Sequence, residues 1–264
     1  MGTIRTFLYY ARRRKRSPED YFLFQRYQGE LIRNAIQRHR SLDKPLLVLD
    51  VGSGIGGYVY ELAKTTPAHF VSLDKNPLPV AIKRYQEFSA IRGKNISLHL
   101  IKQAKIVYNS SRIAVVEGDI TDAPFKDKSF DIIIASGVIE HVPGQRKMIQ
   151  ECHRILKDDG LFYLSFPPYY SPVGGHSISP LHYIPGKFPF WLYQIKTQRQ
   201  DPSFKYYGLY KTTIRSVEKL VKPFFQILER RARVFDFLNP LLSIPIIREF
   251  FIHHVEFFLK KKKR

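Results

Sequence analysis

A strand-like run that leads into a glycine-rich turn is the feature that most constrains the fold of this chain. The apolar run 46–49 reaches Asp50 and then the turn 52–57, Gly-Ser-Gly-Ile-Gly-Gly. A second strand-like run ends on Asp74, at the distance that one crossover helix needs. Glycines let the chain bend sharply and approach a ligand closely, and an acid that closes the next strand can hold two ribose hydroxyls. The pattern predicts a cleft for a nucleoside cofactor.

The residue in front of the turn helps to separate the candidate cofactors. A dinucleotide site would set the helix N-terminus after the turn against a pyrophosphate. Here Asp50 precedes the glycines, and a carboxylate suits a cationic ligand better than an anionic one. No Gly-Lys-Ser or Gly-Lys-Thr follows the turn, so the phosphate cradle of a P-loop is absent.

Four motifs in order resemble those of the class I S-adenosylmethionine-dependent methyltransferases. They lie at 48–57, 72–74, 117–119 and 130–135. The similarity covers about 46–166 and includes Val-Ile-Glu-His-Val-Pro at 138–143, which looks like the segment of the subgroup that methylates small molecules and lipids, ubiquinone-pathway enzymes among them. The resemblance implies S-adenosyl-L-methionine as cofactor. It also implies an α/β fold with a doubly wound, Rossmann-like, seven-stranded and mostly parallel sheet covered by helices on both faces.

The remaining patterns of the chain agree with alternating strands and helices. We expect strands at 46–51, 69–74, 112–117, 130–135, 161–166 and 224–234, and helices at 57–65, 77–90, 145–156 and 212–222. Ser17 as N-cap and Pro18 at the first helical position predict a further helix to about Arg40, of the kind that covers the cofactor cleft in the family. Segment 91–111 receives no assignment.

The chain divides into three predicted parts. Residues 1–41 form a basic segment and a cap helix, and residues 42–234 form the methyltransferase domain, in which the proline- and aromatic-rich segment 167–210 is an acceptor lid. Residues 235–264 form a C-terminal amphipathic helix with a basic tail. Over 245–259 a helical wheel gathers Glu249, His253, Glu256 and Lys260 on one narrow arc, so this helix either packs on the domain or lies in a lipid interface.

The charge of the chain favours an anionic partner. Its formal net charge is +20, from 43 Lys and Arg against 23 Asp and Glu, with basic clusters at 12–16 and 260–264. Nucleic acid, lipid headgroups and phosphorylated substrates all fit, as does a merely solvated basic surface. No apolar stretch approaches the ~20 residues needed to span a bilayer, and Cys152 is the only cysteine. We expect a cytoplasmic protein, peripheral at the inner face of the membrane.

The resemblance also implies a set of cofactor-binding residues. Residues Asp50, Gly52, Ser53 and Gly54 would surround the methionine part of the cofactor, Asp74 the ribose, and Asp119 with Ile120 the adenine. Lys75 and Ser136 complete the predicted set. The alternatives are that Asp119 caps a turn and that the later glycines of the turn only let the following helix pack.

The residues of the chemical step are less well defined. Methyl transfer from a sulfonium is an in-line displacement that mainly requires alignment and the exclusion of water. A hydroxyl acceptor normally needs a base, and His141, His176 and His182 are the candidates. His141 could instead orient a loop through a hydrogen bond, and His176 and His182 could bind the acceptor rather than act as a base. Glu140 beside His141 offers two metal ligands, which do not establish a site, so no metal is predicted.

Together these features predict a methyltransferase that acts on an oxygen of a lipid, a lipid-linked glycan or a related small molecule at an anionic membrane surface. RNA methylation is an alternative that the charge and the tyrosines favour. No accessory RNA-binding motif is visible, however, and the Ser-Phe-Pro-Pro-Tyr run at 165–169 lacks the acidic or amide residue of base-amine methylation. A non-catalytic adaptor that binds the cofactor is the third possibility.

Overall fold

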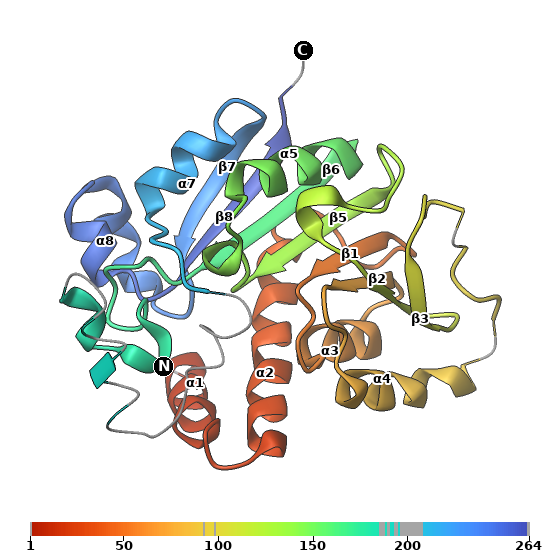
Figure 1. Cartoon of the computed structure of the whole chain (residues 1–264), viewed down its shortest axis with the longest axis horizontal. Coiled ribbons are helices and arrows are strands. Elements are labelled where there is room, and N and C mark those ends of the chain that lie inside the picture. Colours follow the sequence, from red (N-terminus) through yellow and green to blue (C-terminus); the bar gives the residue numbers. More distant parts are fainter. Residues whose placement is uncertain are drawn as a thin grey trace.

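A mixed sheet of eight strands forms the centre of the molecule (Figure 1). The computed structural model describes residues 2–91, 93–97, 99–184, 188, 191–192, 195 and 208–262. The strand order is β3-β4-β2-β1-β5-β6-β8-β7. The strands are β1 (Leu47–Val51), β2 (His69–Asp74), β3 (Lys105–Asn109), β4 (Ile113–Glu117), β5 (Phe130–Ser136), β6 (Leu156–Phe166), β7 (Phe225–Ala232) and β8 (Val255–Lys261).

Helices cover both faces of this sheet (Figure 1). They are α1 (Gly2–Arg13), α2 (Pro18–Gln37), α3 (Gly57–Thr65), α4 (Pro79–Tyr85), α5 (Gln145–Ile155), α7 (Ile214–Val221) and α8 (Ile247–Phe251). Short 3-10 turns are η1 (Gln86–Ala90), η2 (Ile120–Asp122), η3 (Ile139–His141), η4 (His176–Ile178), η5 (Leu181–Tyr183) and η7 (Asp236–Ser243). In the part of the chain that the structure describes, no helix is both long and apolar enough to cross a membrane.

The parallel core follows the prediction. Strands β4, β2, β1, β5 and β6 pair in parallel, and the helices between them cross from one strand to the next. Buried side chains of α2, α3 and α4 form one hydrophobic layer, and those of α5 and α7 form the other. The N-terminus of α2 is capped as expected, because the backbone N–H of Asp20 donates to Ser17 Oγ at 3.0 Å. The doubly wound α/β class is therefore confirmed.

The C-terminal segment differs from the prediction. The expected helix over 245–259 is wrong, since only the five-residue α8 forms there and β8 then enters the sheet antiparallel to both β6 and β7. Val255, Phe257 and Leu259 face one hydrophobic layer, whereas Phe258 faces the other. This alternation buries both faces of β8, which a helix with one polar arc could not do.

Two further elements were absent from the prediction. Strand β3 pairs antiparallel with β4 at the edge of the sheet and comes from the unassigned segment 91–111. Together, β3 and β8 bring the sheet to eight strands, whereas seven were expected. Helix α1 precedes α2, and its buried Phe7 contacts the rings of Phe24, Phe235 and His253. Residues 42–234 thus leave out β8, which belongs to the same sheet.

Candidate active site

A cavity of about 1160 Å³ opens at the carboxyl ends of the parallel strands. One side, which we name the strand-end wall, consists of residues that end or follow β1, β2, β4 and β5: Gly52, Gly54, Asp74, Lys75, Asp119, Ile120 and Ser136. The other side, the cap wall, comes from α1, α2 and the turn between them, from the lid and from the chain after β7: Phe7, Arg14, Lys15, Gln25, His176, Arg233 and His254. Ligands bind at this end of open α/β sheets.

The glycine-rich turn has the backbone geometry that the sequence implies. Gly52 and Gly54 have φ values of 70° and 52°, a region that favours glycine. A Cβ atom at Gly52 would lie 2.7 Å from Cγ2 of Val138. Helix α2 covers the turn, and Gln25 Oε1 accepts a hydrogen bond from the backbone N–H of Gly57 at 3.1 Å. Sequence reasoning missed Gln25, because its contact is made across two helices.

Asp74 is fixed at the cavity by two backbone groups. Its Oδ2 accepts from the N–H of Gly54 at 3.2 Å and its Oδ1 accepts from the N–H of Asn76 at 2.9 Å. Each carboxylate oxygen retains a further lone pair. Two neighbouring hydroxyls of a ribose could donate to those lone pairs, so the position of Asp74 fits the predicted role.

Asp50 is a buried carboxylate beside the turn. It is 2% exposed, and its Oδ2 has no hydrogen-bond partner among the described residues. Burial and then the nearby charge of Asp74 raise the pKa of Asp50 to about 8, against a smaller opposing effect of Ser72. A ligand with a positive charge would stabilise the ionised form. Its environment therefore suits the ammonium or sulfonium group of the predicted cofactor.

Lys75 and Asp119 form an ion pair across the strand-end wall. Lys75 Nζ lies 2.7 Å from Asp119 Oδ2, so the amine points toward the predicted adenine residue. Asp119 also caps η2, with Oδ1 accepting from the N–H of Thr121 at 2.9 Å. Burial raises the pKa of Asp119, but the hydrogen bonds from Lys75 and Thr121 outweigh it and keep this pKa low. Asp119 thus caps a turn and borders the cavity at once.

Arg233 is a buried cation that sequence reasoning missed. It donates to Ser136 Oγ at 3.1 Å, to Glu256 Oε1 at 3.0 Å and to Gln28 Oε1 at 2.7 Å. These bonds join β5, β8 and α2 behind the cavity and hold Ser136 in place. The Arg-Arg-Ala-Arg run 230–233 gives no hint in the sequence of which arginine turns inward.

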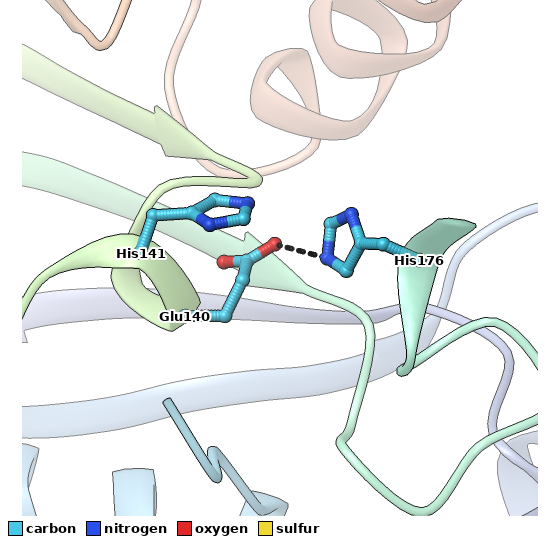
Figure 2. Close-up of side chains that lie close together, drawn as sticks. All are labelled: Glu140, His141 and His176. Carbon is cyan, nitrogen blue, oxygen red and sulfur yellow. Dashed lines mark ion pairs between the residues drawn. The ribbon is translucent and has the colours of Figure 1, made fainter. Parts of the chain in front are cut away.

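Two of the predicted histidines lie together with a glutamate (Figure 2). Glu140 and His141 belong to η3 after β5, and His176 belongs to η4 in the lid. His176 Nε2 lies 3.7 Å from Glu140 Oε1, and the two imidazole rings are 4.9 Å apart. His141 Nδ1 lies 2.6 Å from the carbonyl oxygen of Gly208, which favours the tautomer protonated at Nδ1. The fold thus brings together residues 35 positions apart.

Asp50, Ser53 and His182 lie outside the residues that line the cavity, and Asp50 lies directly behind Val51 and Gly52, which do line it. Ser53 is buried within the turn. His182 is packed inside the lid, where its Nε2 bonds the carbonyl oxygen of Ser171 at 3.2 Å and its ring leaves no room for a Cβ at Gly175. Burial lowers the pKa of His182. This geometry favours a structural role for His182.

Part of the predicted lid 167–210 lies outside the described residues, namely 185–187, 189–190, 193–194 and 196–207. The same holds for Lys263 and Arg264 of the basic tail. The described lid residues that reach the cavity are Pro167, Pro172, Val173, His176, Ser179, Gly208 and Tyr210.

The fold and the strand-end wall define a class: a doubly wound α/β domain that binds a nucleoside cofactor at the end of its parallel strands. Residues 49–164 match the family model described as a methyltransferase domain. This chain therefore carries a class I S-adenosylmethionine-dependent methyltransferase domain, which confirms the predicted family and its cofactor.

Several known proteins are similar to this chain. The sterol 24-C-methyltransferase of Yarrowia lipolytica is 31% identical over 149 residues, which are 53% of this chain and 35% of that protein. The chain spans about a third of the length of that relative. Two solved structures share the fold. A geranyl diphosphate C-methyltransferase from Streptomyces coelicolor has a TM-score of 0.57 at 13% identity, covering 89% of this chain and 75% of the other. A putative sarcosine dimethylglycine methyltransferase from Galdieria sulphuraria has a TM-score of 0.55 at 17% sequence identity, covering 89% of this chain and 85% of the other.

Proposed function

We propose that the chain transfers a methyl group from S-adenosylmethionine to an oxygen of a lipid or lipid-linked acceptor. One observation carries this proposal: a single cavity of about 1160 Å³ joins the strand-end wall to the cluster of Glu140, His141 and His176. Ordinary small-molecule sites enclose ~300–1,000 Å³. The cavity therefore has room for a cofactor and an acceptor side by side.

The charge of the cap wall supports an acceptor that carries a phosphate or another anion. Arg14 and Lys15, from the basic cluster that follows α1, line the cavity. Cations at the entrance of a cavity attract an anionic substrate and raise its local concentration. The N-terminal cluster would then contact the substrate as well as a membrane surface.

An exposed apolar surface beside the lid supports a lipid environment. It comprises six side chains of η7, of α8 and of the residues between them: Phe237, Ile244, Ile246, Ile247, Phe250 and Phe251. Ile246 is 75% and Phe251 60% exposed, and Phe250 stacks on Tyr170 of the lid at 5.4 Å between ring centroids. Exposed apolar patches of this kind are typical of surfaces that bind a membrane or another protein. A lipid could pass from such a surface to the cavity.

The proposed chemistry is an in-line displacement that the walls of the cavity align. The strand-end wall would hold the cofactor, and the acceptor hydroxyl would approach from the side of η3 and η4. His141, protonated at Nδ1, has its Nε2 lone pair as a proton acceptor. The cap wall would exclude water from the reacting atoms.

Carbon methylation of an isoprenoid or sterol-like lipid is a second candidate. The similarity to a sterol 24-C-methyltransferase over half of this chain favours it. Both candidates require an apolar acceptor beside the same cofactor, and they differ in the atom that receives the methyl group.

A transfer assay tests both candidates. The full chain is incubated with cofactor bearing a deuterated methyl group and with separate lipid and RNA extracts, and the products are examined by mass spectrometry and carbon NMR. Label in lipid as a methyl ether or ester supports the first proposal, and label on carbon supports the second. Label in RNA alone, or cofactor binding without transfer to any acceptor, would contradict both and favour RNA methylation or the adaptor.

Membrane binding has its own test, which must use point variants. Deletion of 246–264 would remove β8 from the sheet and unfold the chain. The double variant Ile246→Ser with Phe251→Ser changes two exposed residues and should weaken sedimentation with anionic vesicles roughly tenfold. The matched control is Ile106→Ser with Leu228→Ser, two exposed apolar residues on β3 and β7. Equal binding by both double variants would remove the exposed apolar surface from the proposal.

A further inference from the structure

Three side chains of the types that bind metal ions surround one point of the cavity (Figure 2). They belong to Glu140, His141 and His176. One ligand atom from each residue lies within 4.8 Å of the other two. Ligand atoms around a tetrahedral zinc ion are roughly 3.3 Å apart, given bonds of about 2.0–2.2 Å. Small side-chain rotations would therefore close the cluster on an ion.

The carboxylate of Glu140 needs a partner that the described residues do not supply. Glu140 is 2% exposed, and neither of its oxygens accepts a hydrogen bond. His176 Nε2, which faces Glu140 Oε1 at 3.7 Å, makes no hydrogen bond either. Buried polar groups are nearly always paired, and a buried carboxylate without a partner is costly. An ion pair with His176 would engage one carboxylate oxygen and leave the other unpaired.

His141 has the orientation of a metal ligand. Its Nδ1 donates to the carbonyl oxygen of Gly208 at 2.6 Å, so the lone pair lies on Nε2. Metal-binding histidines commonly donate their second ring N–H to a carbonyl or carboxylate, which fixes the tautomer and the ring. The backbone N–H of Tyr210 also donates to the carbonyl oxygen of Glu140 at 2.7 Å, which ties η3 to the same returning segment.

We propose that Glu140, His141 and His176 bind a divalent transition-metal ion. Two imidazoles and one carboxylate suit zinc, iron or manganese better than magnesium or calcium, which prefer oxygen ligands alone. Three protein ligands leave coordination positions open toward the cavity, as in catalytic rather than structural metal sites. The ion would offset the charge of Glu140 and hold an oxygen of the acceptor.

The role of this ion rests on the proposed transfer to oxygen. With the ion bound, Nε2 of His141 would be a metal ligand and no longer a base, and a hydroxyl on the ion would have a lower pKa and could give up its proton to water. The acceptor oxygen then forms a bond to the methyl carbon while the bond from that carbon to sulfur breaks. The sulfur keeps the electron pair of the broken bond and leaves as neutral S-adenosylhomocysteine. The ion is neither oxidised nor reduced.

Calorimetric titration with Zn²⁺ tests the site directly. The full chain, without a histidine tag and freed of metal by a chelator, should bind one ion with saturation. Glu140→Gln and His176→Ala should each weaken this binding by at least about tenfold, since loss even of an outer-shell partner costs a metal site that much. His99→Ala is the matched control, because His99 is an exposed histidine that contacts Ser97, and its affinity for Zn²⁺ should not change.

The outcomes separate the metal site from the proposed function. S-adenosylhomocysteine binding is measured on every variant and should be retained, which also shows that each is folded. If Glu140→Gln does not fold, His176→Ala still decides, because His176 lies partly exposed in the lid. Absence of saturable Zn²⁺ binding, or equal binding by both variants and the intact chain, would overturn the metal site. Failure to bind S-adenosylhomocysteine, with Zn²⁺ binding intact, would overturn the proposed function alone.

Discussion

The two walls of the cavity are built in different ways. The strand-end wall takes its residues from the turns after parallel strands, and backbone groups hold them, as the N–H groups of Gly54 and Asn76 hold Asp74. The cap wall takes its residues from three distant parts of the chain. Side-chain contacts hold it together, among them the bond of Arg233 to Glu256 and the ring contact of Phe7 with His253.

This difference indicates a division of labour between the two walls. A wall fixed by strand ends keeps its geometry whichever side chains surround it, which suits a constant cofactor. A wall assembled from side-chain contacts changes with few substitutions, which suits a variable acceptor. The following experiments test whether stability, cofactor binding and surface charge divide between the walls in this way.

The largest effect is expected from the strand that ends the chain. Phe257 is fully buried in β8 and stacks on Phe166 of β6. We expect Phe257→Ala to lower the free energy of unfolding by about 3–5 kcal/mol, because the cavity left behind cannot collapse fully. Urea unfolding followed by circular dichroism measures this loss. Phe251→Ala is the control, since this side chain is 60% exposed, and its effect should stay within about 0.5 kcal/mol. If Phe257→Ala and Phe251→Ala lowered the free energy of unfolding by equally small amounts, β8 would not belong to the core.

The same strand shows where prediction from the sequence ended. The parallel core follows from local signals, since each strand is an apolar run bounded by glycine or an acid. Residues 255–259, Val-Glu-Phe-Phe-Leu, carry the β-branched and aromatic content of a buried strand. The helical wheel places Glu256 on an exposed polar arc, and this helical signal outweighs the signal of a strand. Glu256 is in fact buried and pairs with Arg233 and Tyr163.

The residues of the site likewise separate into those that local sequence patterns predict and those that long-range contacts bring together. Gly52, Gly54 and Asp74 could be found because strand ends and glycine spacing are local features of the sequence. The contacts of Gln25 with Gly57 and of Arg233 with Ser136 span 32 and 97 positions. The approach of His176 to Glu140 likewise depends on how the lid folds back. No local pattern encodes such contacts.

Cofactor binding should depend most strongly on Asp74. Asp74→Ala removes a carboxylate that could accept two ribose hydroxyls, and hydrogen bonds to a charged group are worth about 1.5–3 kcal/mol each. We expect the affinity for S-adenosylhomocysteine, measured by calorimetry, to fall by about 100-fold. The control is Asp43→Ala, whose exposed carboxylate accepts a hydrogen bond from Ser41 Oγ at 2.9 Å. Affinity unchanged by Asp74→Ala would place the cofactor elsewhere in the cavity.

The pKa of Asp50 predicts how that affinity varies with pH. The folded chain holds this proton up to about pH 8, whereas the ordinary value is 3.8, so stability falls as pH rises between these values. A ligand with an ammonium group favours the ionised carboxylate. Binding should therefore release a proton below pH 8, and affinity should rise up to about tenfold per pH unit between about pH 6 and 8 before it levels.

Calorimetry in two buffers of different ionisation enthalpy counts this proton. Asp50→Asn keeps the shape of the side chain without its titration, so its binding should be weaker at pH 8 and independent of pH below it. A pH dependence that persists in Asp50→Asn would assign the proton to another group and remove Asp50 from the cationic end of the cofactor.

The smallest effect is expected at the ion pair of Lys75 with Asp119. This pair sharpens the comparison of the two walls, because it lies in the strand-end wall and yet depends on side chains alone. Both partners are at least one-third exposed, and exposed pairs contribute little. Lys75→Ala should change the affinity for S-adenosylhomocysteine by less than about fivefold, with a smaller difference at high salt. Lys105→Ala is the control, because Lys105 pairs with Glu117 at 2.9 Å on an exposed edge of the same sheet. Suppose that Lys75→Ala lowers the affinity nearly as much as Asp74→Ala does, while Lys105→Ala leaves it unchanged. The Lys75 amine would then bind the cofactor itself, and side chains as well as strand ends would fix this wall.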